Sequence, residues 1–195
     1  MISAALSKCT DVYQTEGNFN SQIGVPVTLS RMAEDAKVAV LELGMSEEGQ
    51  METLSKLVRP DICVVTVIGV AHIEYLKTQE NICKEKLSIT TGMNPEGALF
   101  LNGNDKMLAK LRGKTNVNTF FYGTNEWCDY RAENIRMENY TCVYDYVHGD
   151  KKTTVKLNML GRHNIENSLV GMAIADYMGY DIAQAAKGFG DFKGL

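Results

Sequence analysis

The sequence lacks an apolar run of about 18 residues, which is the length that a membrane-spanning helix needs. Its first residues also lack the basic region and the apolar core of a signal peptide. Cysteine is scattered and no C-x-x-C pair occurs, which argues against a zinc site and against a disulfide framework. The cysteines are Cys9, Cys63, Cys83, Cys128 and Cys142. We therefore expect a cytoplasmic protein that is not inserted into a membrane.

An excess of positive charge is absent as well, since the net charge is −4 and the pI is near 5.4. Such a chain has no broad basic surface to attract nucleic acid, so any phosphate ligand has to be held by local contacts. No internal repeat and no proline- or serine-rich linker divides the sequence. With 195 residues, 45% of them hydrophobic, it suits one globular domain over residues 1–195. We expect that domain to be monomeric.

Apolar strands alternate with helices along most of the chain, which predicts an α/β fold with a mostly parallel sheet flanked by helices. Strands are expected at residues 12–15, 36–43, 62–68, 97–102 and 118–123. Helices are expected at residues 2–8, from about Pro26, at 50–58, 79–92, 107–111 and 164–178, and after Asp181. Residues 130–160 alternate in polarity around a turn at 148–150, which predicts a small antiparallel ribbon.

Ligands of an open parallel sheet bind beyond the carboxyl ends of its strands. Glu42 lies at the end of the expected strand 36–43, whereas His72 and Glu74 follow the strand 62–68. A carboxylate in an apolar strand suits a hard cation such as Mg²⁺, and a neutral histidine ring can also bind metal. The alternatives are that Glu42 only marks where the strand reaches water and that His72 is a surface or capping residue.

Two further polar clusters stand at helix starts. Residues 84–86, Lys-Glu-Lys, are most simply a solvated helix face. In the segment 161–167, His163 and Asn167 are four residues apart and share a helix face, and an amide suits the edge of an adenine ring. The alternative for this segment is plain capping by Asn164.

Taken together, a set of short segments carries a more specific signal, because they occur in the order and spacing of the central, ATP-binding domain of the Mur ligase family. The segments are TEGNFN (15–20), IGVP (23–26), ELGMS (42–46), RPD (59–61), IGVAHIE (68–74), KEK (84–86) and GRHNIEN (161–167). The resemblance covers essentially the whole chain. The Gly-Asn-Phe-Asn loop resembles most the branch of the family that adds D-Ala-D-Ala.

The resemblance implies an ADP-forming peptide ligase of peptidoglycan precursor synthesis. In that reaction ATP phosphorylates the terminal carboxylate of UDP-MurNAc-tripeptide, and the amine of D-Ala-D-Ala then attacks the acyl phosphate. By the same resemblance, two Mg²⁺ sites are expected. The implied metal-site and catalytic residues are Glu42, His72 and Lys86, the last as a carbamylated lysine. The implied adenine-facing residues are His163, Asn164 and Asn167, and the implied substrate-binding residues are Asn18 and Asn20.

The departures from the family pattern also carry information. A phosphate-binding Gly-x-x-Gly-Lys-Thr loop precedes the first helix in the family, and Gly113-Lys114-Thr115 lacks the preceding strand and following helix that such a loop needs. We therefore expect the loop, a UDP-binding N-terminal domain and a C-terminal domain to lie outside these residues, and the fragment to be inactive alone. Val67, Gln50 and Ser88 replace an Asn, a Glu and a Glu of the family.

Two other functions stay open at this point. One is a noncatalytic module that binds nucleotide or muropeptide. The other is a different Mur-fold ligase, similar to MurE or to folylpolyglutamate synthase.

Overall fold

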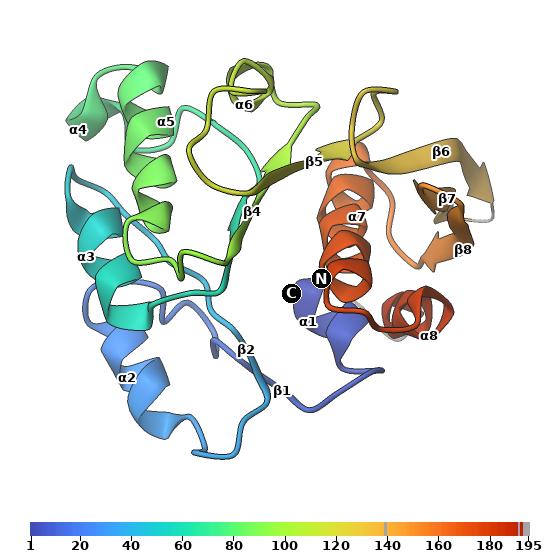
Figure 1. Ribbon diagram of the computed structural model, residues 1–195, viewed down its shortest axis with the longest axis horizontal. Coiled ribbons are helices and arrows are strands. Elements are labelled where there is room, and N and C mark those ends of the chain that lie inside the picture. The colour runs from blue at the N-terminus through green and yellow to red at the C-terminus, as the bar shows by residue number, and fades with distance from the viewer. Residues whose placement is uncertain (139, 191, 193–195) are drawn as a thin grey trace. The chain divides into compact units, whose positions relative to one another are not determined.

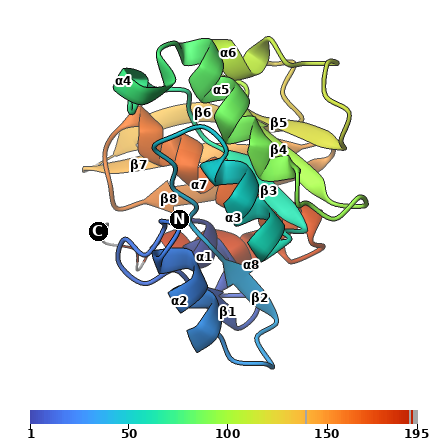
Figure 2. The same ribbon diagram turned by 90° about the vertical axis from the view of Figure 1, so that its left-hand side faces the viewer.

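The computed structural model describes residues 1–138, 140–190 and 192, and its chain packs as two compact units (Figures 1 and 2). Unit 1 comprises Met1–Tyr13, Asp35–Val40 and Phe121–Leu195. Unit 2 comprises Gln14–Glu34 and Leu41–Phe120. The strand β5 (Thr119–Gly123) begins in unit 2 and ends in unit 1.

Unit 2 contains the expected alternation of strands and helices. Its elements are α2 (Gly24–Arg31), α3 (Gln50–Val58), β3 (Ile62–Val65), α4 (Ile73–Leu76), α5 (Gln79–Leu87), η1 (Ser88–Thr90), β4 (Ala98–Asn102) and α6 (Lys106–Ala109). β3 pairs with β4 in parallel, with Cys63 opposite Leu99 and Val65 opposite Leu101. Every residue of β4 is buried, as is typical of a parallel strand covered on both faces.

The helices α3 and α5 pack side by side in unit 2 (Figures 1 and 2). The buried Glu85 of α5 holds the start of α3, because its carboxylate accepts hydrogen bonds from the backbone N–H of Gly49 (3.0 Å) and of Met51 (2.8 Å). These two amides are among those that a helix start leaves without an intrahelical acceptor. A Cβ at Gly92 would overlap the carbonyl oxygen of Ser55, so the segment after η1 can approach α3 this closely only as glycine.

Unit 1 is built around the long helix α7. Its elements are α1 (Ile2–Leu6), the first two residues of β1 (Val12–Gln14), β2 (Val38–Val40), the end of β5, β6 (Tyr130–Glu138), β7 (Thr141–His148), β8 (Lys151–Leu157), α7 (Arg162–Tyr177), α8 (Ile182–Ala186) and η2 (Lys187–Phe189). α7 packs against α1, α8, β6 and β7 (Figure 1). Its residues 168–176 are all buried, which explains why the helix reads as apolar on every side.

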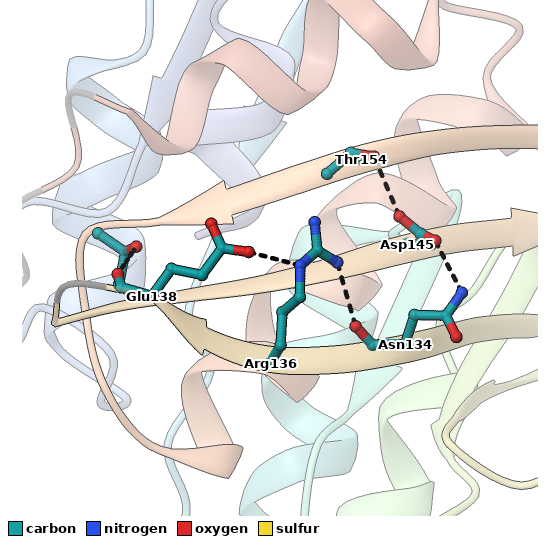
Figure 3. Close-up of polar contacts among 6 residues, drawn as sticks. Asn134, Arg136, Glu138, Asp145 and Thr154 are labelled. Carbon is teal, nitrogen blue, oxygen red and sulfur yellow. Dashed lines mark hydrogen bonds and ion pairs between the residues drawn. The ribbon is translucent and has the colours of Figure 1, made fainter.

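The strands β6, β7 and β8 form the antiparallel ribbon, and β5 pairs with β6 in parallel. The register of β6 shifts between Glu133 and Arg136, where Asn134 adopts a φ of 49°. Figure 3 shows that Asp145 on β7 accepts hydrogen bonds from the side chains of Asn134 (2.9 Å) and Thr154 (3.0 Å), one on each neighbouring strand. This carboxylate therefore fixes the bulge across all three strands.

The expected fold class, a mostly parallel sheet with helices and a small antiparallel ribbon, is confirmed. The turn at 148–150 and the helix 50–58 are also found as expected. The helix expected from Pro26 begins two residues earlier, at Gly24. The helix 79–92 ends as an α-helix at Leu87 and continues only as the short η1.

The strand expected at residues 36–43 was predicted wrongly in its length and burial. β2 covers only Val38–Val40, and none of its residues is fully buried. The segment after it is held by hydrogen bonds to the loop 15–20 instead: the N–H of Glu42 donates to Thr15 Oγ1 (2.9 Å) and the N–H of Gly44 donates to the carbonyl of Asn20 (2.7 Å). The strand 62–68 likewise ends at Val65.

Some expectations fall partly on residues that the structure leaves undescribed. Residue 139 of the expected ribbon, and residues 191 and 193–195 of the expected domain 1–195, lie outside the described residues. Within the described part of the chain, no helix combines the length and apolar character that crossing a bilayer requires.

Candidate functional site

The loop 15–20 and the segment that follows β2 meet through Asn20 and Glu42. The side-chain amide of Asn20 donates a hydrogen bond to Glu42 Oε1 at 2.7 Å. Gly44 leaves room for this amide, since a Cβ there would lie 3.0 Å from Asn20 Cγ. Glu42 is exposed, so its carboxylate is oriented by Asn20 and still accessible to a ligand. Asn18 is also exposed in this loop, and its carbonyl accepts a hydrogen bond from the N–H of Asn20 (2.8 Å).

Lys86 is half-buried near the end of α5. Its Nζ donates a hydrogen bond to the carbonyl of Val67 at 2.8 Å, in the loop that follows β3. Burial lowers the pKa of the Lys86 ammonium below its ordinary value, although the charges of Asp105 and Cys83 act in the opposite direction. The surroundings of Lys86 therefore favour the neutral amine more than those of an exposed lysine do.

The two neighbours of Lys86 differ from each other. Lys84 is exposed and its Nζ lies 3.9 Å from Glu48 Oε1, which fits the solvated helix face expected for residues 84–86. Glu85 contradicts that expectation, because it is buried and holds the start of α3. A local charge pattern could not distinguish the two, since the amides that Glu85 binds are more than thirty residues away along the chain.

His72 stands at the N-cap position of α4, a short helix that the sequence did not predict. Its φ of 64° lies in the left-handed region, which is uncommon for a residue other than glycine. Its carbonyl accepts hydrogen bonds from the N–H groups of Tyr75 (3.1 Å) and Leu76 (3.0 Å), and the residue is exposed. The backbone of His72 is thus the start of α4, while its side chain is available to solvent.

Glu42 is bound to the loop 15–20, whereas Lys86 is bound to the loop after β3. Within residues 1–138, 140–190 and 192, no group of three His, Cys, Asp or Glu side chains lies close enough together to hold a metal ion. The meeting of Glu42, His72 and Lys86 at one ion stays a prediction. Mg²⁺ prefers oxygen ligands, so the carboxylate of Glu42 suits it directly. The amine of Lys86 would suit it only after conversion to an oxygen ligand such as a carbamate.

Besides Lys86, three other side chains bind the backbone of the loop after β3, and none of the three was predicted from the sequence. Asn102 Nδ2 donates to the carbonyl of Thr66 (2.9 Å), and Gln79 Nε2 donates to the carbonyl of Ile68 (3.3 Å). Asp105 Oδ2 accepts from the N–H of Ile68 (2.9 Å). The available signal for Asn102 and Asp105 was the Asn-Gly-Asn-Asp sequence that begins at the last residue of β4 and is typical of turns and helix caps.

The residues expected to face adenine lie in unit 1, at the start of α7. Asn164 is buried, and its Nδ2 donates to the carbonyl of Leu160 (2.8 Å). The capping alternative for Asn164 is wrong, because Gly161 is the N-cap residue of α7 and has no side chain that could accept from the first amides of the helix. The ring of His163 lies against Gly161, whose φ is 114°. Asn167 is half-buried one turn further along the helix.

A hollow of about 380 Å³ opens beside the same end of α7. Its lining is largely apolar and comes from β6, β7, the start of α7 and the residues next to β5 and α7. The lining residues are Thr124, Ile135, Met137, Cys142, Gly161, Arg162 and Ile165. The α7 residues in this lining are neighbours of the three that were expected to face adenine, not those residues themselves. Arg162 stands at the rim, with its Nε 3.2 Å from Glu166 Oε1.

Comparison with known proteins decides the family, because residues 1–175 match the Mur ligase middle domain. The chain belongs to this family. It is 34% identical over 193 residues to the UDP-N-acetylmuramoyl-tripeptide–D-alanyl-D-alanine ligase of Bacillus subtilis, covering 99% of this chain and 41% of that protein. It is 28% identical over 198 residues to the ligase of the same name from Escherichia coli, covering 100% of this chain and 44% of that protein.

Solved structures of Mur ligases have the same fold as this middle domain. MurF from Acinetobacter baumannii superposes with a TM-score of 0.91 and 25% identity, covering 100% of this chain and 43% of that chain. MurF from Thermotoga maritima, solved in complex with ADP, gives a TM-score of 0.85 at 23% identity, covering 100% and 45%. This Mur ligase middle domain therefore spans about two fifths of the length of the proteins it matches.

In this Mur ligase middle domain, Gly113-Lys114-Thr115 is a turn between α6 and β5, as the sequence indicated. Gly113 has a φ of 69°, and the N–H of Lys114 donates to the carbonyl of Leu111 (2.9 Å). The segment does not begin a helix, so it lacks the row of backbone amides that binds phosphate at a helix start.

Gln50, Ser88 and Val67, the positions expected to depart from the family pattern, have local contacts in the structure. Gln50 Oε1 accepts hydrogen bonds from the N–H groups of Ser46 (2.8 Å) and Glu47 (3.3 Å), and so closes the turn before α3. Ser88 Oγ donates to the carbonyl of Lys84 (3.2 Å) at the end of α5. The carbonyl of Val67 accepts the hydrogen bond from Lys86, and the residue is 50% exposed.

Proposed function

We propose that this chain is the central, ATP-binding part of an ADP-forming ligase that joins D-Ala-D-Ala to UDP-MurNAc-tripeptide. The observation that carries the proposal is the hydrogen bond from Asn20 to Glu42, at 2.7 Å. It joins the loop expected to meet the substrate to the carboxylate expected to hold a cation near ATP. The identity of 34% to the Bacillus subtilis ligase, over 99% of this chain, supports the same assignment.

The reaction has two steps. An oxygen of the terminal carboxylate of the tripeptide attacks the γ-phosphorus of ATP, the bond to the bridging oxygen breaks, and ADP leaves. The amine of D-Ala-D-Ala then attacks the acyl carbon and gives a tetrahedral intermediate. That intermediate expels inorganic phosphate as its C–O bond breaks, and the amine nitrogen loses a proton. Catalysis of such phosphoryl transfer depends mainly on positioning and on the neutralisation of charge.

In this proposal Glu42, His72 and carbamylated Lys86 would hold two Mg²⁺ ions, which would supply positive charge next to the phosphates. Asn20 orients the carboxylate of Glu42 and, with Asn18, meets the UDP-linked substrate. His163, Asn164 and Asn167 face adenine. The lowered pKa of Lys86 supports its role, because only the neutral amine can add CO₂. We further propose a monomer in the cytoplasm, where scattered cysteines stay reduced.

The test uses the full-length protein encoded by the reading frame that contains this chain. ADP release is measured with ATP, Mg²⁺, UDP-MurNAc-tripeptide and D-Ala-D-Ala, and then with meso-diaminopimelate, lysine or glutamate as the acceptor. We expect turnover that depends on D-Ala-D-Ala. Preference for a single amino acid would instead indicate a ligase similar to MurE or to folylpolyglutamate synthase. Tight ligand binding without turnover would indicate a noncatalytic module.

A pair of variants tests the site. Glu42→Gln should lower kcat by about 10–100-fold or more, as is typical when groups of a metal site are altered. Glu47→Gln is the matched control, because Glu47 is also exposed and lies only five residues further along the chain. Equal activities of the two variants would remove Glu42 from the site.

A further inference from the structure

The loop after β3 is held by side chains of opposite charge at the two ends of one peptide group, the one that joins Val67 to Ile68. The ammonium of Lys86 donates to the carbonyl of Val67 at 2.8 Å, and the carboxylate of Asp105 accepts from the N–H of Ile68 at 2.9 Å. Each charge faces the end of a peptide group that has the opposite partial charge, so both contacts are of the stronger, charge-assisted kind. Asn102 and Gln79 bind the carbonyls on either side.

Asp105 links this loop to a second element. Its Oδ1 accepts hydrogen bonds from the N–H groups of Met107 (2.8 Å) and Leu108 (3.0 Å), and so caps the start of α6. Its Oδ2 is the atom that binds Ile68. The side chain of Ile68 is 4% exposed and anchors the loop in the core. One carboxylate therefore fixes the loop to α6 with both of its oxygens.

The anchored part of the loop lies shortly before His72 in the chain. The backbone is bound at residues 66–68, and His72 follows only four residues after Ile68. Lys86 of α5 is bound to Val67 of the same loop. The contacts of Asp105 and Lys86 thus fix the position of residues 67 and 68, from which the chain continues to His72, relative to the amine of Lys86.

We propose that Asp105 is a positioning residue of the magnesium site, acting through the N–H of Ile68 to hold the loop that carries His72 beside Lys86. This inference rests on the proposed function for the role of the metal. The hydrogen bond between Asp105 and the N–H of Ile68 is independent of the proposed function, because it is a property of the folded chain.

Asp105→Asn separates the two roles of the carboxylate. Asparagine is as good an N-cap residue as aspartate, so its amide oxygen can keep the bonds to Met107 and Leu108. Its NH₂ group then faces the N–H of Ile68 and cannot accept from it. Asp181→Asn is the matched control, because Asp181 caps α8 in the same way, through Ala183 (2.8 Å) and Gln184 (3.3 Å).

The first measurement is hydrogen exchange of backbone amides in the 195-residue chain. In Asp105→Asn the amide of Ile68 should exchange about tenfold faster or more, while the amides of Met107 and Leu108 keep their protection. Asp181→Asn should leave Ile68 unchanged. An unchanged exchange rate at Ile68 in Asp105→Asn would overturn the proposal at its first step.

The second measurement is the Mg²⁺ dependence of the full-length ligase. Asp105→Asn should raise the half-saturating Mg²⁺ concentration about tenfold and leave the KM of UDP-MurNAc-tripeptide unchanged, whereas Asp181→Asn should change neither. Faster exchange at Ile68 with an unaltered Mg²⁺ curve would refute the positioning role and leave the proposed function standing. If the wild type has no ligase activity, the proposed function and the magnesium role fail together, and the exchange result then describes a structural contact alone.

Discussion

Replacement of Asp176 by alanine should destabilise unit 1 by about 3–5 kcal/mol, the usual cost of breaking a buried ionic cluster. Asp176 lies near the end of α7 with a fully buried side chain. Its carboxylate accepts hydrogen bonds from Tyr146 Oη (2.7 Å) and His148 Nδ1 (2.7 Å) on β7 and from Lys151 Nζ on β8. The group therefore ties the ribbon to the helix that forms the core of the unit.

The partners of Asp176 should differ in their contributions. Tyr146 is fully buried, so Tyr146→Phe should cost about 1.5–3 kcal/mol, the range for a hydrogen bond to a charged group. The side chain of Lys151 is 57% exposed, so Lys151→Met should cost less than about 1 kcal/mol because solvent already screens the pair. The expected order of destabilisation is Asp176→Ala, then Tyr146→Phe, then Lys151→Met.

Urea unfolding followed by tryptophan fluorescence measures these values, since Trp127 is the only tryptophan of the chain and belongs to unit 1. The indole packs edge-on against Phe121, with ring centroids 5.3 Å apart, so loss of this packing on unfolding should change its emission. A cost for Lys151→Met as large as that for Tyr146→Phe would refute the screening argument. A cost below about 1 kcal/mol for Asp176→Ala would refute the role of the cluster altogether.

The same cluster predicts how acid affects stability. Burial acts to raise the pKa of Asp176, but the hydrogen bonds from Lys151, Tyr146 and His148 outweigh it and hold the pKa below its ordinary value. The unfolded chain, with a pKa of about 3.9, then takes up the proton first on acidification. The stabilisation is present above about pH 4 and is lost as the pH falls through the folded-state pKa. Asp176→Ala should remove this acid dependence, and an unchanged pH profile would contradict the assignment.

Three further predictions concern other parts of the chain. Glu85→Gln should destabilise unit 2 by about 1.5–3 kcal/mol in urea unfolding followed by circular dichroism, whereas Lys84→Gln should have little effect. Asn134→Ala should raise the pKa of Asp145 from about 2 towards its ordinary value, because the Asn134 hydrogen bond is the main cause of the shift; an NMR titration that finds no change would contradict this. The isolated chain should release no ADP and should bind ATP weakly in calorimetry, since no phosphate-binding loop occurs within its 195 residues; ADP release dependent on D-Ala-D-Ala would contradict that expectation.

Hydrophobic patterning correctly predicted the helix α3, which has one apolar face, and the strand β4, in which every residue is buried. Residues 50–58 form α3 with the expected bounds, and the apolar segment 97–102 becomes the wholly buried β4. The same kind of pattern failed at residues 36–43, where an apolar run is equally strong. A strand needs a partner strand for its backbone hydrogen bonds as well as apolar residues. The N–H groups of Glu42 and Gly44 donate to the loop 15–20 instead.

The candidate site shows a different limit. Glu42, His72 and Lys86 were named from short segments, but nothing in those segments indicates what holds them in place. The groups that do so include Asn20 for Glu42 and Asp105 for the loop after β3, at separations of 22 and 37 residues. Such contacts depend on the packing of whole elements, and sequence periodicity carries no information about them.

The contacts that hold the loop after β3 use its backbone atoms, so they do not depend on which side chain stands at position 67. The contact to Lys86 is made by the carbonyl of Val67, and any residue supplies a carbonyl. The neighbouring contact is made by the N–H of Ile68, which any residue except proline also supplies. The position of this loop therefore depends on the side chains that reach it, Asn102, Asp105, Gln79 and Lys86, more than on the side chains of residues 66–68. A search for the determinants of the site in related sequences should accordingly begin at the end of β4 and on α5.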